Sequence, residues 1–281
     1  MVPAAPAAKL AKGRTLAADE VVVDLEDAVV PGAKAQALGE VAGALGGEWA
    51  AAAVAVRVNA IGSPWCHLEL AALAASGREA VTAVVPKVEH PHDLAFADRL
   101  LAGAEAAAGR TAPVRLLALI ETAAGLAAVG EIARASARLD GLVIGYADLA
   151  ASLGRPEDAG SPQDWRFAQD AVLVAARAAG IQAIDGPHLS IRDDDAFRAA
   201  VDHARSLGFD GKWAIHPAQL DALREAFTPT DAEVADARAT LAALEAAAVE
   251  GAGAVADGDR MLDEALAVSA RRVLARAGGE R

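Results

Sequence analysis

One stretch decides how this chain folds: Val21-Val22-Val23-Asp24-Leu25-Glu26-Asp27-Ala28-Val29. Three β-branched apolar residues predict a buried strand, and three carboxylates follow within four positions. Acidic residues also favour the N-terminus of a helix, so the stretch taken alone does not identify a functional site. The functional interpretation gains weight because apolar runs that end in a polar residue recur along the chain.

The recurring runs have polar ends at Arg57, Lys87, Glu121, Asp148, Asp185 and His216. Their average spacing is about 32 residues, close to one βα unit, and Ala- and Leu-rich helical segments lie between them. This alternation predicts parallel strands with right-handed crossovers. We expect an α/β fold, a (β/α)8 TIM barrel, because polar ends spread over every strand would meet at one mouth. An open doubly wound sheet would gather them at one switch point instead.

The first strand of this barrel is expected to be truncated, because only Met1–Pro3 precedes the first helical segment. We assign residues 1–228 to the catalytic barrel and residues 229–281 to a C-terminal helical extension or lid. Within the extension, the Thr230–Glu233 capping box predicts a helix that ends near Val249. A Gly-rich hinge over 251–258 and an amphipathic helix over 261–277 are expected to follow.

The composition excludes several classes of protein. A formal net charge of −13 argues against a nucleic-acid partner, which would require a basic stripe. No apolar run is long enough to suggest a membrane span. The single cysteine, Cys66, excludes an internal disulfide and fits a reducing compartment, so we expect a cytoplasmic protein.

The polar strand ends would bring several carboxylates together at the mouth of the barrel. Unpaired carboxylates in contact raise one another's pKa, and a divalent hard cation relieves that repulsion. Mg2+ prefers oxygen ligands from one or two carboxylates, completed by water and substrate. Glu121 and Asp148 are therefore the predicted metal ligands, although each could instead cap the helix that follows it. Zinc is disfavoured because the six histidines lack a recognised ligand spacing.

Two cationic residues at strand ends, Arg57 and Lys87, are further candidates for substrate binding or catalysis. Arg57 could bind a substrate carboxylate through a bidentate contact, or it could form a structural ion pair with Glu26 or Asp27. Lys87 could form a Schiff base, but the neighbouring carboxylates favour a charged, ion-paired lysine.

Six motifs along the chain resemble those of citrate lyase beta-subunit-like proteins of the HpcH/HpaI aldolase superfamily. They are Val22-Val23-Asp24-Leu25-Glu26-Asp27-Ala28-Val29, Val56-Arg57-Val58-Asn59, Val85-Pro86-Lys87-Val88-Glu89, Ile120-Glu121-Thr122-Ala123-Ala124-Gly125, Gly145-Tyr146-Ala147-Asp148-Leu149 and Ile215-His216-Pro217-Ala218-Gln219. The resemblance implies a (β/α)8 barrel in trimers or hexamers. It also implies the cleavage or formation of carbon–carbon bonds in acyl-CoA thioesters such as citryl-, malyl- or citramalyl-CoA.

The resemblance also implies roles for individual residues. Glu121 and Asp148 would bind Mg2+, and Arg57 and Glu121 would contact the oxoacid portion of the substrate. Glu26 and Asp27 would support the metal-bound waters, with Lys87 beside them. Asp263, in Met261-Leu262-Asp263, would correspond to a lid aspartate that serves as acid/base in a neighbouring subunit's site.

The expected function is thus a Mg2+-dependent acyl-CoA lyase acting on an oxoacid and an acyl-CoA thioester. One alternative is a malyl-CoA thioesterase or malate-synthase-like enzyme with the same constellation. Another is a barrel subunit without catalysis, suggested by the short first strand and by Ala147, where the family usually has Glu. An aldolase on free oxoacids is a weaker alternative, because its expected histidine base has no clear position.

Overall fold

The computed structural model describes residues 1–156, 162–249, 251–257 and 260–278. The chain forms two compact units, Met1–Leu223 and a second unit that begins at Arg224. Among the described residues no helix is both long and apolar enough to cross a membrane.

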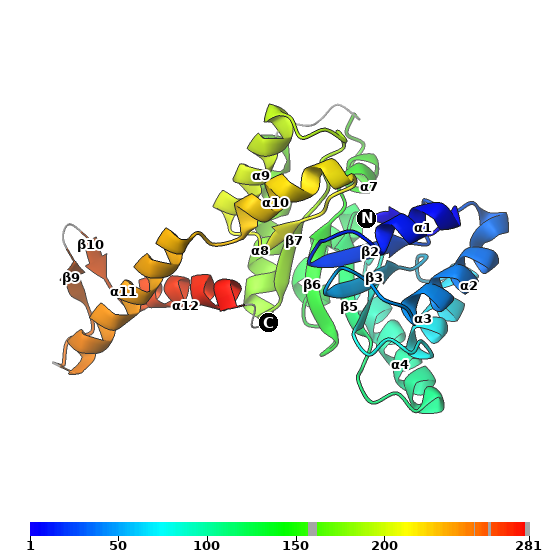
Figure 1. Ribbon diagram of the computed structural model, residues 1–281, viewed down its shortest axis with the longest axis horizontal. Coiled ribbons are helices and arrows are strands. Elements are labelled where there is room, and N and C mark those ends of the chain that lie inside the picture. The colour runs from blue at the N-terminus through cyan, green and yellow to red at the C-terminus, as the bar shows by residue number, and fades with distance from the viewer. Residues whose placement is uncertain (157–161, 250, 258–259, 279–281) are drawn as a thin grey trace. The chain divides into compact units, whose positions relative to one another are not determined.

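The first unit is built on eight parallel strands that pair in sequence order (Figure 1). They are β1 (Val2–Pro3), β2 (Glu20–Asp24), β3 (Ala53–Arg57), β4 (Val81–Val85), β5 (Arg115–Ile120), β6 (Leu139–Ile144), β7 (Gln182–Asp185) and β8 (Gly211–Lys212). Strand number, order and direction agree with the predicted βα repeat. The strands are Val-, Leu- and Ile-rich because both faces of the sheet are covered.

The sheet curls but its ladder does not close. Within the described residues β8 and β1 share no strand pairing, so the expected closed barrel is not formed by backbone ladders. Instead, the backbone nitrogen of Met1 donates a hydrogen bond of 2.5 Å to the carbonyl of Ala214, just after β8. Both strands at this seam contain only two residues, which leaves little backbone to pair.

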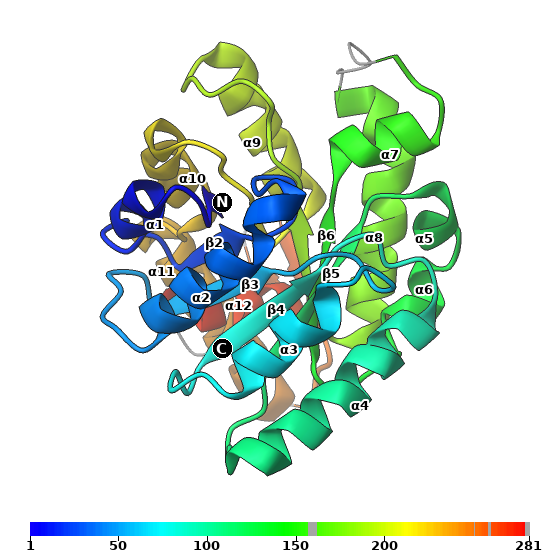
Figure 2. The ribbon, with the colours of Figure 1, turned by 90° about the vertical axis from the view of Figure 1, so that its right-hand side faces the viewer.

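Helices connect the strands and cover the sheet. Figure 2 shows α2, α3 and α4 on the outer side of the curled strands. The helices of this unit are α1 (Ala7–Gly13), α2 (Lys34–Leu45), α3 (Cys66–Ala74), α4 (Pro91–Ala108), α5 (Ala123–Ala127), α6 (Val129–Ile132), α7 (Tyr146–Ser152), α8 (Arg166–Ala179) and α9 (Asp195–Leu207), with short 3-10 turns at Pro31–Ala33, Pro162–Trp165 and Pro217–Gln219. The boundary between the two units falls within α10 (Leu220–Phe227).

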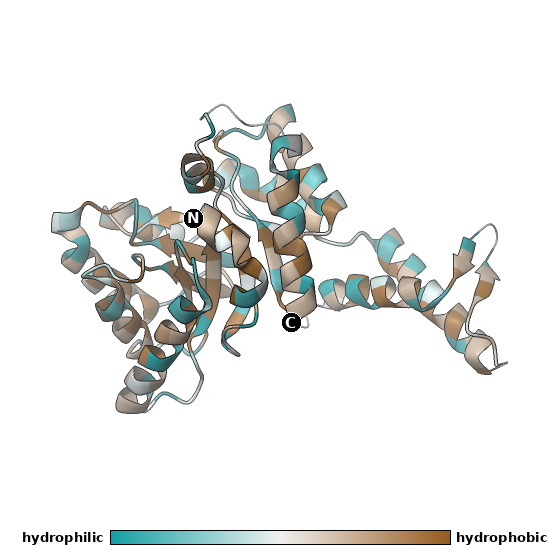
Figure 3. Cartoon of the chain, turned by 180° about the vertical axis from the view of Figure 1, so that it is seen from behind, coloured by the Kyte–Doolittle hydropathy of each residue, from teal (hydrophilic) through white to brown (hydrophobic). Residues whose placement is uncertain are grey.

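The interior of the curled sheet is an apolar cluster, and the strands are mostly brown in the hydropathy view (Figure 3). Its members come from β2 to β6 and from the residue that directly follows β8: Val22, Ala55, Val84, Leu117, Leu119, Val143 and Trp213. Side chains alternate along a strand, so Asp24 lies on the same side as Val22, and Arg57 on the same side as Ala55. The charged residues therefore form the next layer of the interior, at the carboxyl ends of the strands.

Four predicted strand ends lie outside strands. Lys87 and Glu121 follow the ends of β4 and β5 by two residues and by one residue, and Asp148 and His216 lie farther from their strands. Asp148 is in the first turn of α7, because the strand stops at Ile144 and Gly145 caps the helix. His216 caps the 3-10 turn Pro217–Gln219, four residues after β8 ends at Lys212. Short loops separate the polar residue from the apolar run in both cases, and hydrophobic periodicity does not reveal where a strand stops.

The second unit contains α11 (Asp231–Val249), β9 (Val255–Asp257), β10 (Arg260–Leu262) and α12 (Glu264–Gly278). The predicted capping box is confirmed, since Glu233 N–H donates to Thr230 Oγ1 and the Glu233 carboxylate accepts from Thr230 N–H. The prediction of a Gly-rich hinge over 251–258 is wrong for residues 255–257, which form a strand. An antiparallel pair, β9 with β10, occupies part of that segment, and α12 begins at Glu264 rather than at residue 261.

Candidate active site

The acidic tip of β2 binds the guanidinium of Arg57 at the end of β3. Asp24 and Arg57 are partners in the strand register, and Asp24 accepts two hydrogen bonds from Arg57, at 2.8 and 2.7 Å. Arg57 also forms ion pairs with Glu26 at 2.8 Å and with the exposed Asp27 at 3.2 Å. Burial lowers the pKa of Arg57, but these carboxylates more than offset that effect and raise it. Arg57 is a permanent, buried cation.

Lys34, a buried lysine that was not predicted from the sequence, forms hydrogen bonds with the backbone at this tip. The ammonium of Lys34 donates to the carbonyls of Leu25 and Glu26, at 2.8 and 2.6 Å, and to the side chain of Asn59 at 2.6 Å. Asn59 in turn donates to the buried carboxylate of Glu69. The available signal was that Lys34 is the single basic residue between Ala28 and Val56. These bonds fix the backbone that carries Glu26.

Lys87 connects the tip of β2 to α7. Its ammonium lies 2.5 Å from Glu26 Oε1 and 3.1 Å from Asp148 Oδ2. Burial lowers the pKa of Lys87, but Glu26, Glu121 and Asp148 together raise it above its ordinary value. Lys87 adopts a φ of +51°, in the left-handed region that non-glycine residues rarely occupy. This backbone turns its N–H toward Glu121 Oε1, at 2.9 Å.

Glu121 follows β5 directly and is 2% exposed. Burial raises its pKa to about 8, and the neighbouring charges of Asp148 and Glu26 add to this rise against the opposing effect of Lys87. Burial therefore outweighs the stabilisation that the Lys87 cation gives to the ionised form of Glu121. Strongly perturbed groups of this kind concentrate at functional sites.

Gly145 allows the carboxylate of Glu121 to lie against the end of β6. A β-carbon at position 145 would lie 2.6 Å from Cβ of Glu121 and would overlap its Oε2 atom. The N–H of Gly145 also donates to the carbonyl of Ile120 at 3.0 Å. The glycine therefore brings α7, and with it Asp148, close to Glu121.

The sequence-predicted residues Glu26, Asp27, Arg57, Lys87, Glu121 and Asp148 are thus brought together by the ends of β2, β3, β4 and β5 and by α7. Oε2 of Glu26 is buried and, although it faces Arg57, accepts no hydrogen bond. Among the described residues no three His, Cys, Asp or Glu side chains form a ready-made metal cage. The donor set suits a cation that takes one or two carboxylates and completes its shell with water and substrate oxygens, as Mg2+ does.

Asp263 lies in the second unit, just before α12. Its carboxylate accepts hydrogen bonds from the N–H groups of Ala265 and Leu266, at 3.0 and 3.2 Å, so it acts as the helix cap. Its side chain is exposed.

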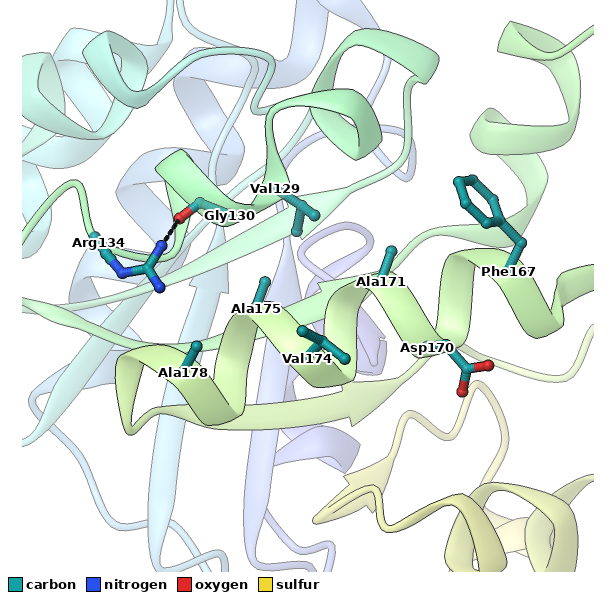
Figure 4. A pocket seen from close by; sticks show the side chains of 9 residues that line it. All are labelled: Val129, Gly130, Arg134, Phe167, Asp170, Ala171, Val174, Ala175 and Ala178. Carbon is teal, nitrogen blue, oxygen red and sulfur yellow. Dashed lines mark hydrogen bonds between the residues drawn. The ribbon is translucent and has the colours of Figure 1, made fainter.

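A separate apolar groove of about 500 Å3 lies between α6 and α8 (Figure 4). Phe167 and Val174 line it and are 75% and 69% exposed. None of its lining residues belongs to the acidic cluster, so the groove is not the predicted reaction site.

Comparison with known proteins identifies one family to which this chain is similar along most of its length. A family model described as HpcH/HpaI aldolase/citrate lyase matches residues 1–217. The chain is 39% identical over 265 residues to L-malyl-CoA/beta-methylmalyl-CoA lyase of Rhodobacter capsulatus, covering 88% of this chain and 83% of the relative. It is 37% identical to citrate lyase subunit beta of Escherichia coli, covering 98% and 91%. It is 36% identical to a (3S)-malyl-CoA thioesterase of Cereibacter sphaeroides, covering 98% and 92%.

A similar solved structure is that of the protein CitE from Mycobacterium tuberculosis in complex with magnesium, acetoacetate and coenzyme A. It shares 31% sequence identity with this chain at a TM-score of 0.76, and the match covers 98% of this chain and 96% of that one.

Proposed function

The chain belongs to the HpcH/HpaI aldolase/citrate lyase family, and from this premise we propose that it is a Mg2+-dependent carbon–carbon lyase. Its substrate would be a 3-hydroxyacyl-CoA thioester of the dicarboxylate type, such as malyl-, citramalyl- or citryl-CoA, and its products an oxoacid and an acyl-CoA. The names of two relatives, a malyl-CoA lyase and a citrate lyase subunit, support this class. The observation that carries the proposal is the buried Glu121 carboxyl beside Asp148.

Glu121 and Asp148 are the residues that would hold the metal. Burial raises the pKa of Glu121 and the charge of Asp148 adds to the rise, and a bound cation would lower this pKa again. Gly145 keeps the space beside Oε2 of Glu121 clear of a side chain. When bound, Mg2+ supplies a Lewis acid that polarises the oxoacid carbonyl and orients its carboxylate, worth several kcal/mol of charge stabilisation.

Arg57 would contribute the carboxylate contact. Its exposed partner Asp27 is the one that a substrate carboxylate can replace, since that pair is the longest of the three at 3.2 Å. Asp24 would keep the guanidinium oriented through its two hydrogen bonds during the exchange. Glu26 and Lys87 would orient metal-bound water and balance the charge of the site.

Asp263 would act as acid/base on the acyl-CoA portion, as the resemblance implies, with the second unit as a lid in a homo-oligomer. In the cleavage direction the hydroxyl proton leaves as the carbon–carbon bond breaks, and the acyl-CoA product takes up a proton at the carbon released. An exposed carboxylate on a helix cap is accessible for that transfer.

The test is to incubate the protein with malyl-CoA or citramalyl-CoA and Mg2+, and to measure oxoacid and acyl-CoA together. A lyase releases both in equal amounts and no free thiol, and Glu121→Ala abolishes the reaction. Failure of the wild-type protein to release any oxoacid from malyl-, citramalyl- or citryl-CoA with Mg2+ present would contradict the proposal.

A second candidate is thioester hydrolysis after or instead of cleavage, favoured by the similarity to a (3S)-malyl-CoA thioesterase. The same incubation separates the two reactions. Free thiol with no oxoacid would identify a thioesterase.

A further inference from the structure

A second buried polar network contacts the first turn of α7, the helix that carries Asp148. The side chains of Asp185 and Lys212 are 2% and 3% exposed and pair at 2.6 Å. They are register partners at the ends of β7 and β8. Ile184 and Trp213, one residue away along the chain, pack with the interior cluster, so this pair projects toward the covering helices.

Tyr146, the only tyrosine of the chain, joins this pair to α7. Its hydroxyl donates to Oδ1 of Asp185 and accepts a 2.8 Å hydrogen bond from Gln169 on α8. Its ring packs on Trp165, with centroids 5.1 Å apart. Gly186 makes room for the ring, since a β-carbon there would lie 2.8 Å from it.

The first turn of α7 needs such an anchor. The helix has only seven residues, and no side chain caps its N-terminus. Gly145, Tyr146 and Asp148 share this turn: Gly145 packs on Glu121, Tyr146 reaches Asp185, and Asp148 reaches Lys87. Contacts with Glu121 and Lys87 and the contact with Asp185 therefore fix this turn together. The orientation of the Asp148 carboxylate depends on both sets of contacts.

We propose that Tyr146 is a positioning residue for Asp148, holding the first turn of α7 through its hydrogen bond to the buried Asp185–Lys212 pair. The inference rests on the proposed function, because it treats Asp148 as a ligand for Mg2+. Residues that orient a metal ligand from outside the coordination shell typically contribute 10- to 100-fold to metal affinity. Tyr146 acts in this way without touching the metal or the substrate.

The experiment compares Mg2+ binding by wild-type protein and Tyr146→Phe, using isothermal titration with MgCl2 alone, well below the melting temperature of either protein. Phenylalanine keeps the ring packing and removes only the hydroxyl. We expect the Kd for Mg2+ to rise about 10-fold. The control is Asp210→Asn, which weakens a different ion pair, at 2.7 Å, between Arg177 near the end of α8 and Asp210 just before β8. It should lower the melting temperature and leave the Kd unchanged.

The outcomes separate this inference from the proposal on which it rests. Wild-type binding that Glu121→Ala abolishes, combined with an unchanged Kd in Tyr146→Phe, overturns the positioning role alone. An equal rise in Kd for Asp210→Asn also overturns it, because general destabilisation would then explain the effect. No Mg2+ binding by the wild-type protein overturns both.

Discussion

Replacing Glu121 by glutamine is expected to stabilise the metal-free protein at alkaline pH. Glu121 ionises near 4.5 when exposed, whereas burial and its carboxylate neighbours raise its pKa to about 8 in the fold. Between these two values the folded protein keeps a proton that the unfolded chain has lost. The free energy of unfolding therefore falls as pH rises through this window, and the loss is complete above about pH 8.

The size of the effect follows from the same values. A tenfold change in proton affinity corresponds to about 1.4 kcal/mol, so the full rise from 4.5 to about 8 corresponds to roughly 4–5 kcal/mol. Glutamine has no proton to lose, and its carbonyl can still accept the hydrogen bond from Lys87 N–H. The variant should thus be more stable than the wild type at pH 9 and similar to it at pH 5.

Urea unfolding in EDTA at pH values from 5 to 9 measures this difference. Glu131→Gln, at an exposed glutamate on α6, serves as the matched control and should follow the wild-type curve. Adding Mg2+ should stabilise the wild type and not Glu121→Gln. A stability difference between variant and wild type that is the same at pH 5 and pH 9 would refute the reasoning.

Three further substitutions test the geometry of the site. Gly145→Ala should cost about 1–3 kcal/mol of stability, because the new β-carbon overlaps Glu121. It should also weaken Mg2+ binding in calorimetry, and unchanged binding would contradict the close packing of Gly145 on Glu121. Arg57→Lys should cost about 1.5–3 kcal/mol in urea unfolding, because lysine cannot make the bidentate contact to Asp24. It should also abolish any rise in melting temperature that oxoacids cause. If that rise is retained, Arg57 does not bind the substrate carboxylate. Lys34→Met should cost about 1–3 kcal/mol, because it removes three buried hydrogen bonds, to the carbonyls of Leu25 and Glu26 and to the side chain of Asn59. Arg166→Ala, at an exposed helix pair, should cost less than about 0.5 kcal/mol, and equal losses would count against the Lys34 network.

The strand order and the convergence of polar ends could be predicted because both depend on local patterns. A Val-rich run followed by a charged residue locates a buried strand, and parallel strands carry their ends to one edge. This reasoning brought Glu26, Arg57, Lys87 and Glu121 to the same place. Asp148 was included as well, although its position on α7 was not foreseen.

The supporting contacts could not be predicted, because they depend on which side chains meet across the sheet. Lys34 and Tyr146 stand in helices whose sequence gives no sign of a buried polar partner. The β9–β10 pair was missed since its strands have only three residues each, too few to show alternation. Closure of the barrel at β1 and β8 likewise depends on pairing over two-residue strands, about which hydrophobic periodicity says nothing.

The acidic residues that follow Val23, at the tip of β2, have a specific structural role. Asp24 binds Arg57, and the backbone of Leu25 and Glu26 is fixed by Lys34. This acidic tip orients the arginine and the lysine that border the carboxylates Glu121 and Asp148, and it leaves those two carboxylates as the candidates for direct metal contact.

Crystals soaked with Mn2+ as a stand-in for Mg2+, together with an oxoacid such as pyruvate or glyoxylate, test the central claim most directly. The account predicts one anomalous peak within bonding distance of carboxylate oxygens of both Glu121 and Asp148, with the oxoacid between the ion and Arg57. A peak elsewhere, or an oxoacid bound away from these residues, would contradict it.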